Sequence, residues 1–243
     1  MFPYRPMTKE HFEKLRNHMD DVSFECIIQQ NPIEREGLLF PENSLLHYDK
    51  LPDGEPDRIC FANDVAWGGG DFLSMPVGKV YGMDVYIDDV IHSQKDKYTT
   101  RPLVVDAIIR NRASAGFFEF NNGGDEYMDD IVKELRRRGY ICAIRGSRAP
   151  VNKSKLDRIL ACAPEIKGTI TDGSGYRVHF KSKAARHGDK MYEAFMKQLT
   201  AFNQEAKYQG KQHDDAADAT ASLITNVLTE TSSGKMSSIP YSA

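Results

Sequence analysis

The pattern of apolar and polar positions divides the chain into three parts. Residues 1–57 are rich in Pro, Glu and Asp, and they predict one helix at 8–20 followed by an irregular connecting arm without the alternation of a buried core. Apolar runs then recur at short intervals over residues 58–228, which is typical of a folded domain. The last residues, 229–243, are mostly small and polar, and we expect them to form a flexible tail.

Three apolar stretches in close succession, at 58–64, 71–81 and 83–93, predict an antiparallel ladder of strands with Gly82 in the second turn. Helical spacing then alternates with short apolar runs. The expected elements are helices at 99–113 and 125–139, strands at 116–122 and 140–146, helices at 153–163, 188–206 and 214–228, and a β-hairpin at 168–180. This order predicts an α/β fold whose mixed central sheet, three antiparallel strands and then parallel strands, is flanked by helices and carries an extra β-hairpin.

Composition narrows the class of protein. The 243 residues, of which 40% are hydrophobic and 28% charged, suffice for one substantial domain. The net charge of -3 and the pI of 6.2 differ from those of strongly basic nucleic-acid-binding tails, so any affinity for DNA has to come from local patches. Four cysteines without CxxC spacing indicate reduced thiols, and no apolar run approaches the roughly 20 residues of a membrane span. We therefore expect no membrane partner.

Two candidate carboxylates fall on predicted strands. Asp64 ends the first strand and precedes the glycine run 68–70, which leaves the space beside the strand end open. Glu119 lies between Phe118 and Phe120 in the fourth strand, and alternation places its side chain on the face opposite to both rings. A charged side chain in so apolar a strand needs a partner of opposite charge.

The stretch KQHDDAADATASL at 211–223 supplies further acids on the last predicted helix. Asp215 and Asp218 are three residues apart and share one face, and the alanines around them let the helix approach the sheet closely. Asp214 is expected to cap the helix N-terminus. In an alternative register Asp214 and Asp218, four residues apart, share the face; we favour the first pair. His213, just before the helix, fits either a role beside metal ions or a capping role.

Carboxylates that converge from strands and a helix repel one another unless protons or cations neutralise them. Oxygen ligands of this kind suit Mg²⁺ or Mn²⁺, and two such ions roughly 3.5–4 Å apart activate water and stabilise the leaving oxygen of a phosphodiester. We therefore predict a two-ion site that hydrolyses a nucleic-acid backbone. The predicted catalytic residues are Asp64, Glu119 and Asp215, with Asp218 as a further metal ligand; secondary candidates are Asp214, His213 and Asp71, which also fits a turn.

Basic residues are concentrated between Lys133 and Arg158, where nine of them stand against two acidic residues. This local excess in a chain of net negative charge predicts a track for phosphate groups. The predicted DNA-binding residues are Arg145, Arg148, Lys153, Lys155 and Arg158. The run 136–138 fits equally well as cations that complement a helix C-terminus.

Four stretches resemble the ribonuclease-H-like nuclease domain of the large terminase subunit, the DNA-packaging enzyme of tailed bacteriophages and herpesviruses. They are FANDVAWGGGD, FFEFNNGGDEY, NKSKLDRIL and KQHDDAADATASL, and the second carries the family's acidic residue with Asn-Asn-Gly-Gly after it. The segment VSFECIIQQNPIEREGLLF also resembles the join between motor and nuclease in these proteins. The resemblance therefore covers about residues 23 to 228.

The resemblance implies a metal-dependent endonuclease that cleaves double-stranded phage DNA during genome packaging, in the cytoplasm of the infected host cell. Its implied partners are an ATPase motor domain, the small terminase subunit and the portal protein. The sequence contains no GxxxxGK[ST] loop that would hold ATP phosphates. We expect the motor either to precede this chain in a longer protein or to be encoded separately, and the residue range favours the former.

Two other interpretations remain open. A Holliday-junction resolvase or transposase of the same fold also places acids on its first strand, fourth strand and last helix, but the Asn-Asn-Gly-Gly stretch and the upstream join favour a terminase. A non-catalytic nucleic-acid-binding module of this fold would use its acids only for structure. The complete set of acids favours an enzyme.

Overall fold

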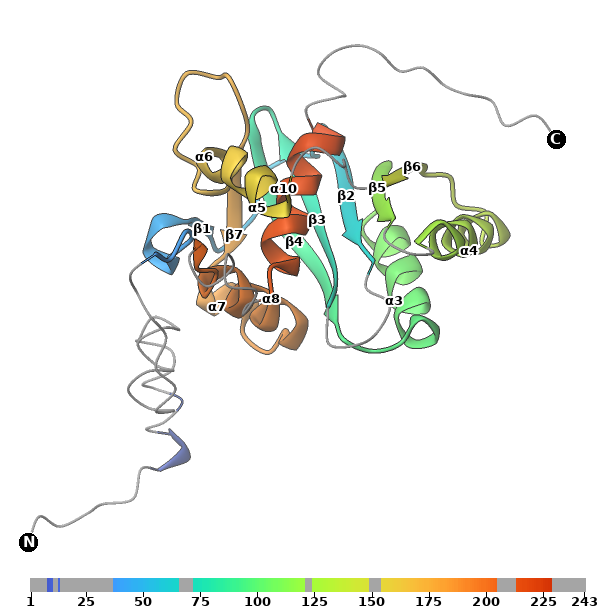
Figure 1. Ribbon diagram of the computed structural model, residues 1–243, viewed down its shortest axis with the longest axis horizontal. Helices are drawn as coiled ribbons and strands as arrows, with labels where there is room; N and C mark the ends of the chain where they lie inside the picture. Colours follow the sequence, from blue (N-terminus) through green and yellow to red (C-terminus); the bar gives the residue numbers. More distant parts are fainter. Residues whose placement is uncertain are drawn as a thin grey trace, which may run out of the picture.

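A mixed sheet of seven strands forms the centre of the computed structural model, which describes residues 8–10, 13, 37–65, 72–120, 124–148, 154–204 and 213–228 (Figure 1). The strands are β1 (Leu46–Tyr48), β2 (Arg58–Asp64), β3 (Leu73–Tyr81), β4 (Asp84–Ser93), β5 (Ala115–Phe120), β6 (Ala143–Arg148) and β7 (Arg177–Lys181). They lie side by side in the order β1-β7-β4-β3-β2-β5-β6.

The antiparallel ladder predicted from the sequence is confirmed. β2, β3 and β4 pair antiparallel, and the turn between β3 and β4 passes through Gly82 at a φ of 61°, which glycine adopts without strain. On the other side of β2, β5 and β6 join in parallel. This is the ribonuclease-H-like arrangement expected for the chain. The antiparallel strands β3 and β4 lie on one side of β2, and the parallel strands β5 and β6 lie on the other.

Helices cover both faces of the sheet. They are α3 (Lys97–Arg110), α4 (Gly124–Arg137), α5 (Lys155–Ala161), α6 (Ala163–Ile166), α7 (Lys183–Arg186), α8 (Lys190–Thr200) and α10 (Asp215–Leu223), with the 3-10 turn η1 (Glu42–Ser44) and the π-helical turn η2 (Ile224–Leu228). Along β2, Cys60 and Ala62 belong to a core shared with α5, α6, α8 and α10, whereas Phe61 and Val65 belong to a core shared with α3 and α4. Alternation along one strand therefore separates two apolar cores.

The helix that carries the candidate aspartates lies close against the sheet. α10 packs on β2 and β3, between α5 and α8 (Figure 1). Its four alanines, at positions 216, 217, 219 and 221, are all buried, so most of the side chains along this part of the helix are short. Gly78 on β3 helps, because a Cβ there would meet the Leu223 side chain at 3.3 Å. The close approach predicted from the alanines is confirmed.

The predicted hairpin at 168–180 is wrong. Residues 168–176 form no strand, and the segment that follows them becomes β7, which pairs in parallel with both β4 and β1. Val178 and Phe180 explain the choice, because both are fully buried in the core shared with α6 when β7 lies beside β4. The first half of the predicted hairpin has only Ile170 as a large apolar side chain and gains little by pairing.

The described part of the predicted connecting arm, residues 37–57, packs on the domain. β1 extends the sheet beside β7, Leu38 forms an isolated antiparallel bridge with Asn203, and the Phe40 ring stacks on Phe202 at 6.1 Å. The predicted helix at 8–20 and the predicted tail fall almost entirely outside the described residues. Among those residues, no helix combines the length and the apolar character needed to cross a membrane.

Candidate active site

A row of polar side chains crosses the sheet on the face covered by α10. Strand pairing aligns Glu119 with Asp64, Asp64 with Ser74, and Ser74 with His92, while Ser147 lies beside Glu119 at the other end. Paired residues on neighbouring strands point to the same face, so the row runs from β6 to β4. Both carboxylates predicted on strands therefore meet at the centre of the sheet.

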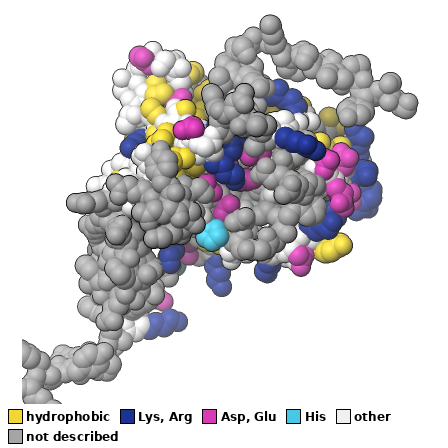
Figure 2. Space-filling model, viewed as in Figure 1, with side chains coloured by type: hydrophobic (Ala, Val, Ile, Leu, Met, Phe, Trp, Pro, Cys, Tyr) yellow, Lys and Arg dark blue, Asp and Glu magenta, His cyan; other side chains and the backbone are white. Residues whose placement is uncertain are grey.

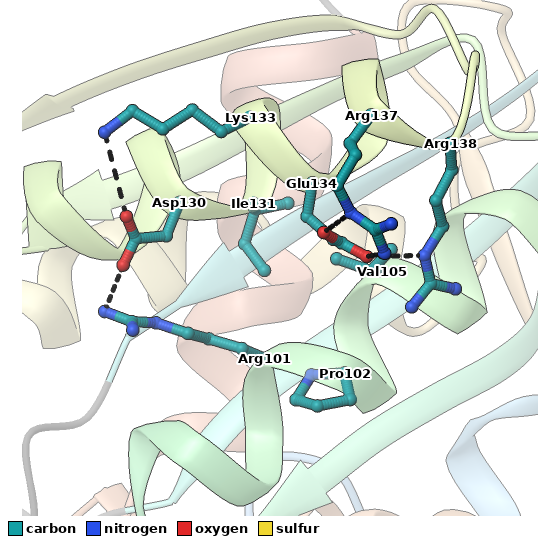
Figure 3. Close-up of a pocket in the computed structure, with 9 residues that line it drawn as sticks. All are labelled: Arg101, Pro102, Val105, Asp130, Ile131, Lys133, Glu134, Arg137 and Arg138. Atoms are coloured by element: carbon teal, nitrogen blue, oxygen red, sulfur yellow. Dashed lines mark hydrogen bonds and ion pairs between the residues drawn. The ribbon is translucent and has the colours of Figure 1, made fainter.

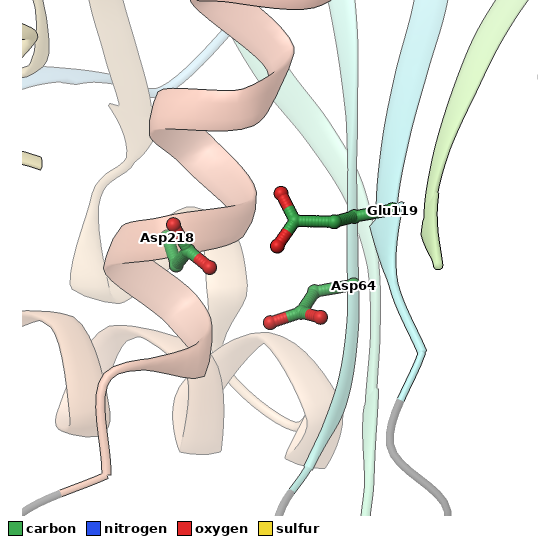
Figure 4. Close-up of side chains that lie close together, drawn as sticks. All are labelled: Asp64, Glu119 and Asp218. Atoms are coloured by element: carbon green, nitrogen blue, oxygen red, sulfur yellow. The ribbon is translucent and has the colours of Figure 1, made fainter. Parts of the chain in front are cut away.

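The third carboxylate of this group comes from α10. Asp64, Glu119 and Asp218 each offer an oxygen, and these oxygens all lie within 4.8 Å of one another (Figure 4). The exposed fractions of the three residues are 5%, 2% and 1%. Such burial is costly for three negative charges, and only protons or cations can offset it.

Asp215, predicted to be catalytic, lies outside this group of three. Its Oδ2 accepts hydrogen bonds from the Phe72 backbone N–H and from the Gln198 side chain, both at 3.3 Å. Burial first and the charge of Asp64 second raise the pKa of Asp215 to about 6, although the Phe72 N–H opposes the shift. Asp215 is therefore near enough to Asp64 to feel its charge, but its hydrogen bonds hold it toward the start of β3 and toward α8.

The structure places the secondary candidates Asp214 and His213 in different surroundings at the start of α10. Asp214 occupies the N-cap position as predicted, but its side chain makes no capping hydrogen bond, so the predicted capping role is wrong. It is buried instead, and its charge contributes to the raised pKa of Asp64. His213 is exposed, with Nδ1 3.8 Å from Asp215 Oδ2. Asp71 lies outside the described residues.

Two cations from the first turns of α5 point into the carboxylate group. Lys155 Nζ lies 2.8 Å from Asp64 Oδ2 and 3.1 Å from Asp218 Oδ2. Arg158 donates from both terminal nitrogens to Glu119, and its Nη2 lies 3.1 Å from Asp218 Oδ1. With all five side chains ionised, one negative charge remains. These contacts were not foreseen, since both residues were predicted to contact DNA.

Local structure explains why both α5 cations face the same way. A capping box of Ser154 and Asp157 begins the helix, because Ser154 Oγ accepts from the Asp157 N–H and the Asp157 side chain accepts from the Ser154 N–H. Lys155 and Arg158 are three residues apart and therefore share one face of the helix. The capping box and the three-residue spacing in NKSKLDRIL were the features of the sequence that could have predicted that Lys155 and Arg158 share one face of a helix.

The pKa shifts in the group follow from burial first and from charges second. Burial raises the pKa of Asp64 and Asp218, and each neighbouring carboxylate adds to the effect, while Lys155 opposes it. For Lys155 the balance is reversed: burial lowers its pKa, but the charges of Asp64 and Asp218 outweigh burial and raise it. The carboxylates thus favour protons or cations, and the lysine stays charged.

The remaining predicted DNA-binding residues lie on β6. Arg145 stands two positions before Ser147 and so shares the face of the polar row, where its Nη2 donates to the Asn226 carbonyl at 3.0 Å. Arg148 is exposed at the end of the strand, on the opposite face. Figure 2 shows Lys, Arg, Asp and Glu side chains gathered near the middle of the α10 side. Lys153 lies outside the described residues.

A separate cavity of about 370 Å³ lies between α3 and α4, on the other side of the sheet (Figure 3). Its charged side chains pair among themselves: Arg101 with Asp130 at 2.6 Å, and Arg137 and Arg138 with Glu134 at 2.7 and 2.8 Å. The Arg101–Asp130 pair joins the two helices, whereas the other two pairs lie at the C-terminal end of α4. We assign the cavity no ligand.

Comparison with known proteins was informative only at the level of structure. No family model matches the sequence, and no curated protein sequence matches it. Among solved structures, a mutant nuclease domain of the large terminase subunit gp2 of bacterial virus Sf6, with manganese and beta-thujaplicinol, aligns with a TM-score of 0.51. The alignment covers 70% of this chain and 89% of that one at 14% identity. The chain has the terminase nuclease fold.

A second terminase extends the likeness. The large terminase of a thermophilic bacteriophage aligns with a TM-score of 0.52 and 12% identity, over 91% of this chain and 53% of that chain. This chain therefore spans about half the length of the thermophilic phage protein. The resemblance predicted from four short sequence stretches is confirmed for the fold, while identity this low leaves the roles of individual residues to be argued from their geometry.

Proposed function

We propose that this chain is the nuclease part of a phage large terminase, a divalent-metal-dependent endonuclease that cleaves double-stranded DNA during genome packaging. The observation that carries the proposal is the meeting of Asp64, Glu119 and Asp218 within 4.8 Å, from two strands and a helix, on the terminase nuclease fold. Three buried carboxylates in this arrangement have little structural purpose, since apolar side chains would stabilise the core better.

The donor set fits Mg²⁺ or Mn²⁺. It consists of carboxylate oxygens alone, which these hard cations prefer, and burial first and neighbouring carboxylates as well raise the pKa of Asp64 and Asp218, which favours the binding of protons or cations there. The manganese named with the Sf6 nuclease domain supports this choice. We propose two ions, held by Asp64, Glu119 and Asp218, with Asp215 at the rim. When bound, they would supply an activated water and stabilise the leaving oxygen of a phosphodiester.

The residues of the chain itself bind and orient the DNA backbone in this proposal. Lys155 is 32% exposed at its side chain, so its ammonium group can contact a phosphate while it remains beside Asp64. Arg158 is more deeply buried and orients Glu119 through two hydrogen bonds. Arg145, on the same face of the sheet, is placed to contact the backbone further along.

The proposed partners follow from the same assignment. The substrate is double-stranded DNA, and the chain works with an ATPase motor domain, a small terminase subunit and a portal protein in the cytoplasm of the infected host cell. The alignment with about half of the thermophilic phage's large terminase supports a place beside further terminase domains.

The test is incubation of the purified protein with supercoiled plasmid in Mn²⁺, in Mg²⁺ or in EDTA. We expect nicked and linear products with either ion and none with EDTA. Cleavage that persists in EDTA would contradict metal dependence, and intact plasmid at every metal concentration would contradict the nuclease assignment.

One observation favours a second candidate, a non-catalytic nucleic-acid-binding module. Lys155 and Arg158 pair with all three carboxylates, and a purely structural ion-pair group would look the same. Plasmid binding without cleavage would support this candidate. A marked preference for cleaving four-way junctions over linear duplex would instead indicate a resolvase.

A further inference from the structure

The first turn of α10 lacks the usual cap from its own sequence. A residue at the N-cap position normally accepts a hydrogen bond from one of the first backbone N–H groups, yet the Asp214 side chain makes no such bond. Those N–H groups belong to a buried helix end, because every residue from Asp214 to Leu223 is buried. A buried helix end needs another acceptor.

Gln198 supplies that acceptor from a different helix. It lies near the end of α8, and its Oε1 accepts a hydrogen bond from the Ala216 N–H at 2.6 Å. The Nε2 of the same amide donates to Asp215 Oδ2 at 3.3 Å. One side chain therefore contacts the first two residues of α10, as acceptor for one and donor for the other.

The neighbouring contacts extend this arrangement to the sheet. Asp215 Oδ2 also accepts from the Phe72 N–H at the start of β3, so the carboxylate joins α8, α10 and the sheet. Asp218 follows within the first helical turn, and its own N–H donates to the Asp214 carbonyl at 2.8 Å. The rotation of this turn therefore decides where the Asp218 carboxylate lies relative to Asp64 and Glu119.

We propose that Gln198 is a positioning residue for the metal site, which caps α10 from α8 and thereby holds Asp218 against Asp64 and Glu119. The proposal rests on the proposed function for the role of Asp218. It gives Gln198 no contact with DNA or with the ions. Residues that orient a ligand in this way typically change metal affinity by 10- to 100-fold when they are replaced.

Two substitutions of Gln198 distinguish the hydrogen bond that it accepts from Ala216 from the hydrogen bond that it donates to Asp215. Gln198→Met keeps the length and helix propensity of the side chain but removes both hydrogen bonds. Gln198→Glu keeps an acceptor for the Ala216 N–H and removes the donor to Asp215. Lys197→Met is the matched control, because it alters the exposed neighbour on the same helix.

The first measurement is hydrogen exchange of the Ala216 amide in the metal-free full chain. We expect exchange at least about fivefold faster in Gln198→Met, near the wild-type rate in Gln198→Glu, and unchanged in Lys197→Met. The second measurement titrates Mn²⁺ alone into each variant and repeats the titration in plasmid cleavage. Gln198→Met should need about tenfold more Mn²⁺ in both, with little change in the KM for plasmid, and should lower the Tm by only the few degrees that the loss of one helix cap costs.

The outcomes are distinguishable. An unchanged Ala216 exchange rate in Gln198→Met would overturn the capping role, and faster exchange with an unaltered Mn²⁺ requirement would overturn the positioning role. If Gln198→Met fails to fold, Gln198→Glu decides: an Ala216 amide that exchanges as fast as in a frayed helix end would overturn the proposal. A wild-type protein that neither binds Mn²⁺ nor cleaves plasmid would overturn the proposed function itself.

Discussion

The ion pairs that line the cavity beside α3 and α4 and those around the three clustered carboxylates use the same chemical groups in opposite surroundings. In the first set Arg137, 72% exposed at its side chain, pairs with Glu134. In the second, Arg158 is 10% exposed and pairs with Asp218, which is 1% exposed. Exposed pairs contribute little to stability because water screens them, whereas buried charges are costly even when paired. The buried set is therefore the one that requires a functional explanation.

The direction of the pKa shifts separates the two sets as well. Hydrogen bonds from Arg137 and Arg138 lower the pKa of Glu134 to about 2, because the opposing effect of burial is smaller than either of them. Burial raises the pKa of Asp218 although Lys155 and Arg158 lie beside it. Two neighbouring cations thus keep the surface carboxylate of Glu134 ionised, whereas two cations beside the buried carboxylate of Asp218 do not offset the effect of burial. The binding of a further cation or of a proton is therefore still favoured at Asp218.

The largest expected effect comes from removing charge in the buried set. Asp64→Asn and Glu119→Gln keep the shape of each side chain but remove the charge that would hold the ions, so plasmid cleavage should fall by about 1,000-fold, or about 4 kcal/mol of transition-state stabilisation. Initial nicking rates at saturating Mn²⁺ measure this, with Glu134→Gln as the control. If either variant keeps more than about a tenth of the wild-type rate, the residue that it replaces is not a metal ligand.

A buried group without a charged partner supplies an intermediate case. His92 ends the polar row, with Nδ1 3.2 Å from Ser74 Oγ, and burial, followed by the nearby His213, lowers its pKa to about 4. Below pH about 6.5 the unfolded chain binds a proton that the folded chain refuses until pH about 4. The free energy of unfolding should therefore fall as the pH drops through this window, by up to about 3 kcal/mol from this residue.

Urea unfolding between pH 4.5 and 7 tests the assignment to His92. The loss of stability on acidification should be smaller in His92→Gln, whose side chain does not titrate, than in the wild type. Comparing the two proteins cancels the carboxylates, whose raised pKa values act in the opposite direction. Equal pH slopes for both proteins would mean that another group titrates in this window.

A smaller effect distinguishes the aspartates of α10. Asp218→Asn should lower the nicking rate about tenfold more than Asp215→Asn, because Asp218 lies with Asp64 and Glu119 whereas Asp215 is hydrogen-bonded toward Phe72. Asp214→Asn should have the mildest effect of the three. A greater loss in Asp215→Asn would support the catalytic role that the sequence predicted for Asp215.

The smallest expected effect is in the exposed set. Glu134→Gln removes the partner of Arg137 and Arg138, yet all three groups remain in water, so the Tm should stay within about 2 °C of the wild type and cleavage should not change. Thermal unfolding at low and at moderate salt measures it. A large drop in Tm would mean that the pairs of Glu134 at the end of α4 contribute to stability.

Patterns within short stretches of the sequence predicted the features of the fold that depend on neighbouring residues. Alternation gave the ladder of β2, β3 and β4 and the direction of Glu119, and the alanine pattern gave the close packing of α10. Long-range choices were missed. The parallel pairing of β7 depends on a core assembled from distant segments, and no local signal distinguishes it from a hairpin.

The same limit explains which arrangements within the site the sequence left undetermined. Asp215 and Asp218 share a helix face, and only the neighbours of each, Gln198 and Phe72 for one and Asp64 for the other, determine which carboxylate joins the group. A run of basic residues likewise predicts where positive charge lies along the chain, but not whether each side chain points toward solvent or toward the core. Lys155 turned inward because α5 packs beside α10, a contact between segments about 60 residues apart.

The short strand β1 has a consequence for how the chain can be divided. It covers one edge of β7, and without it the backbone groups of residues 179–181 would face solvent on that side. A chain shortened to begin at residue 58 would keep every carboxylate of the site but would expose this edge, together with the apolar surface left by Phe40. Open edges of this kind pair with one another, so such a fragment should self-associate in concentrated solution, and residue 37 is the safer place to start.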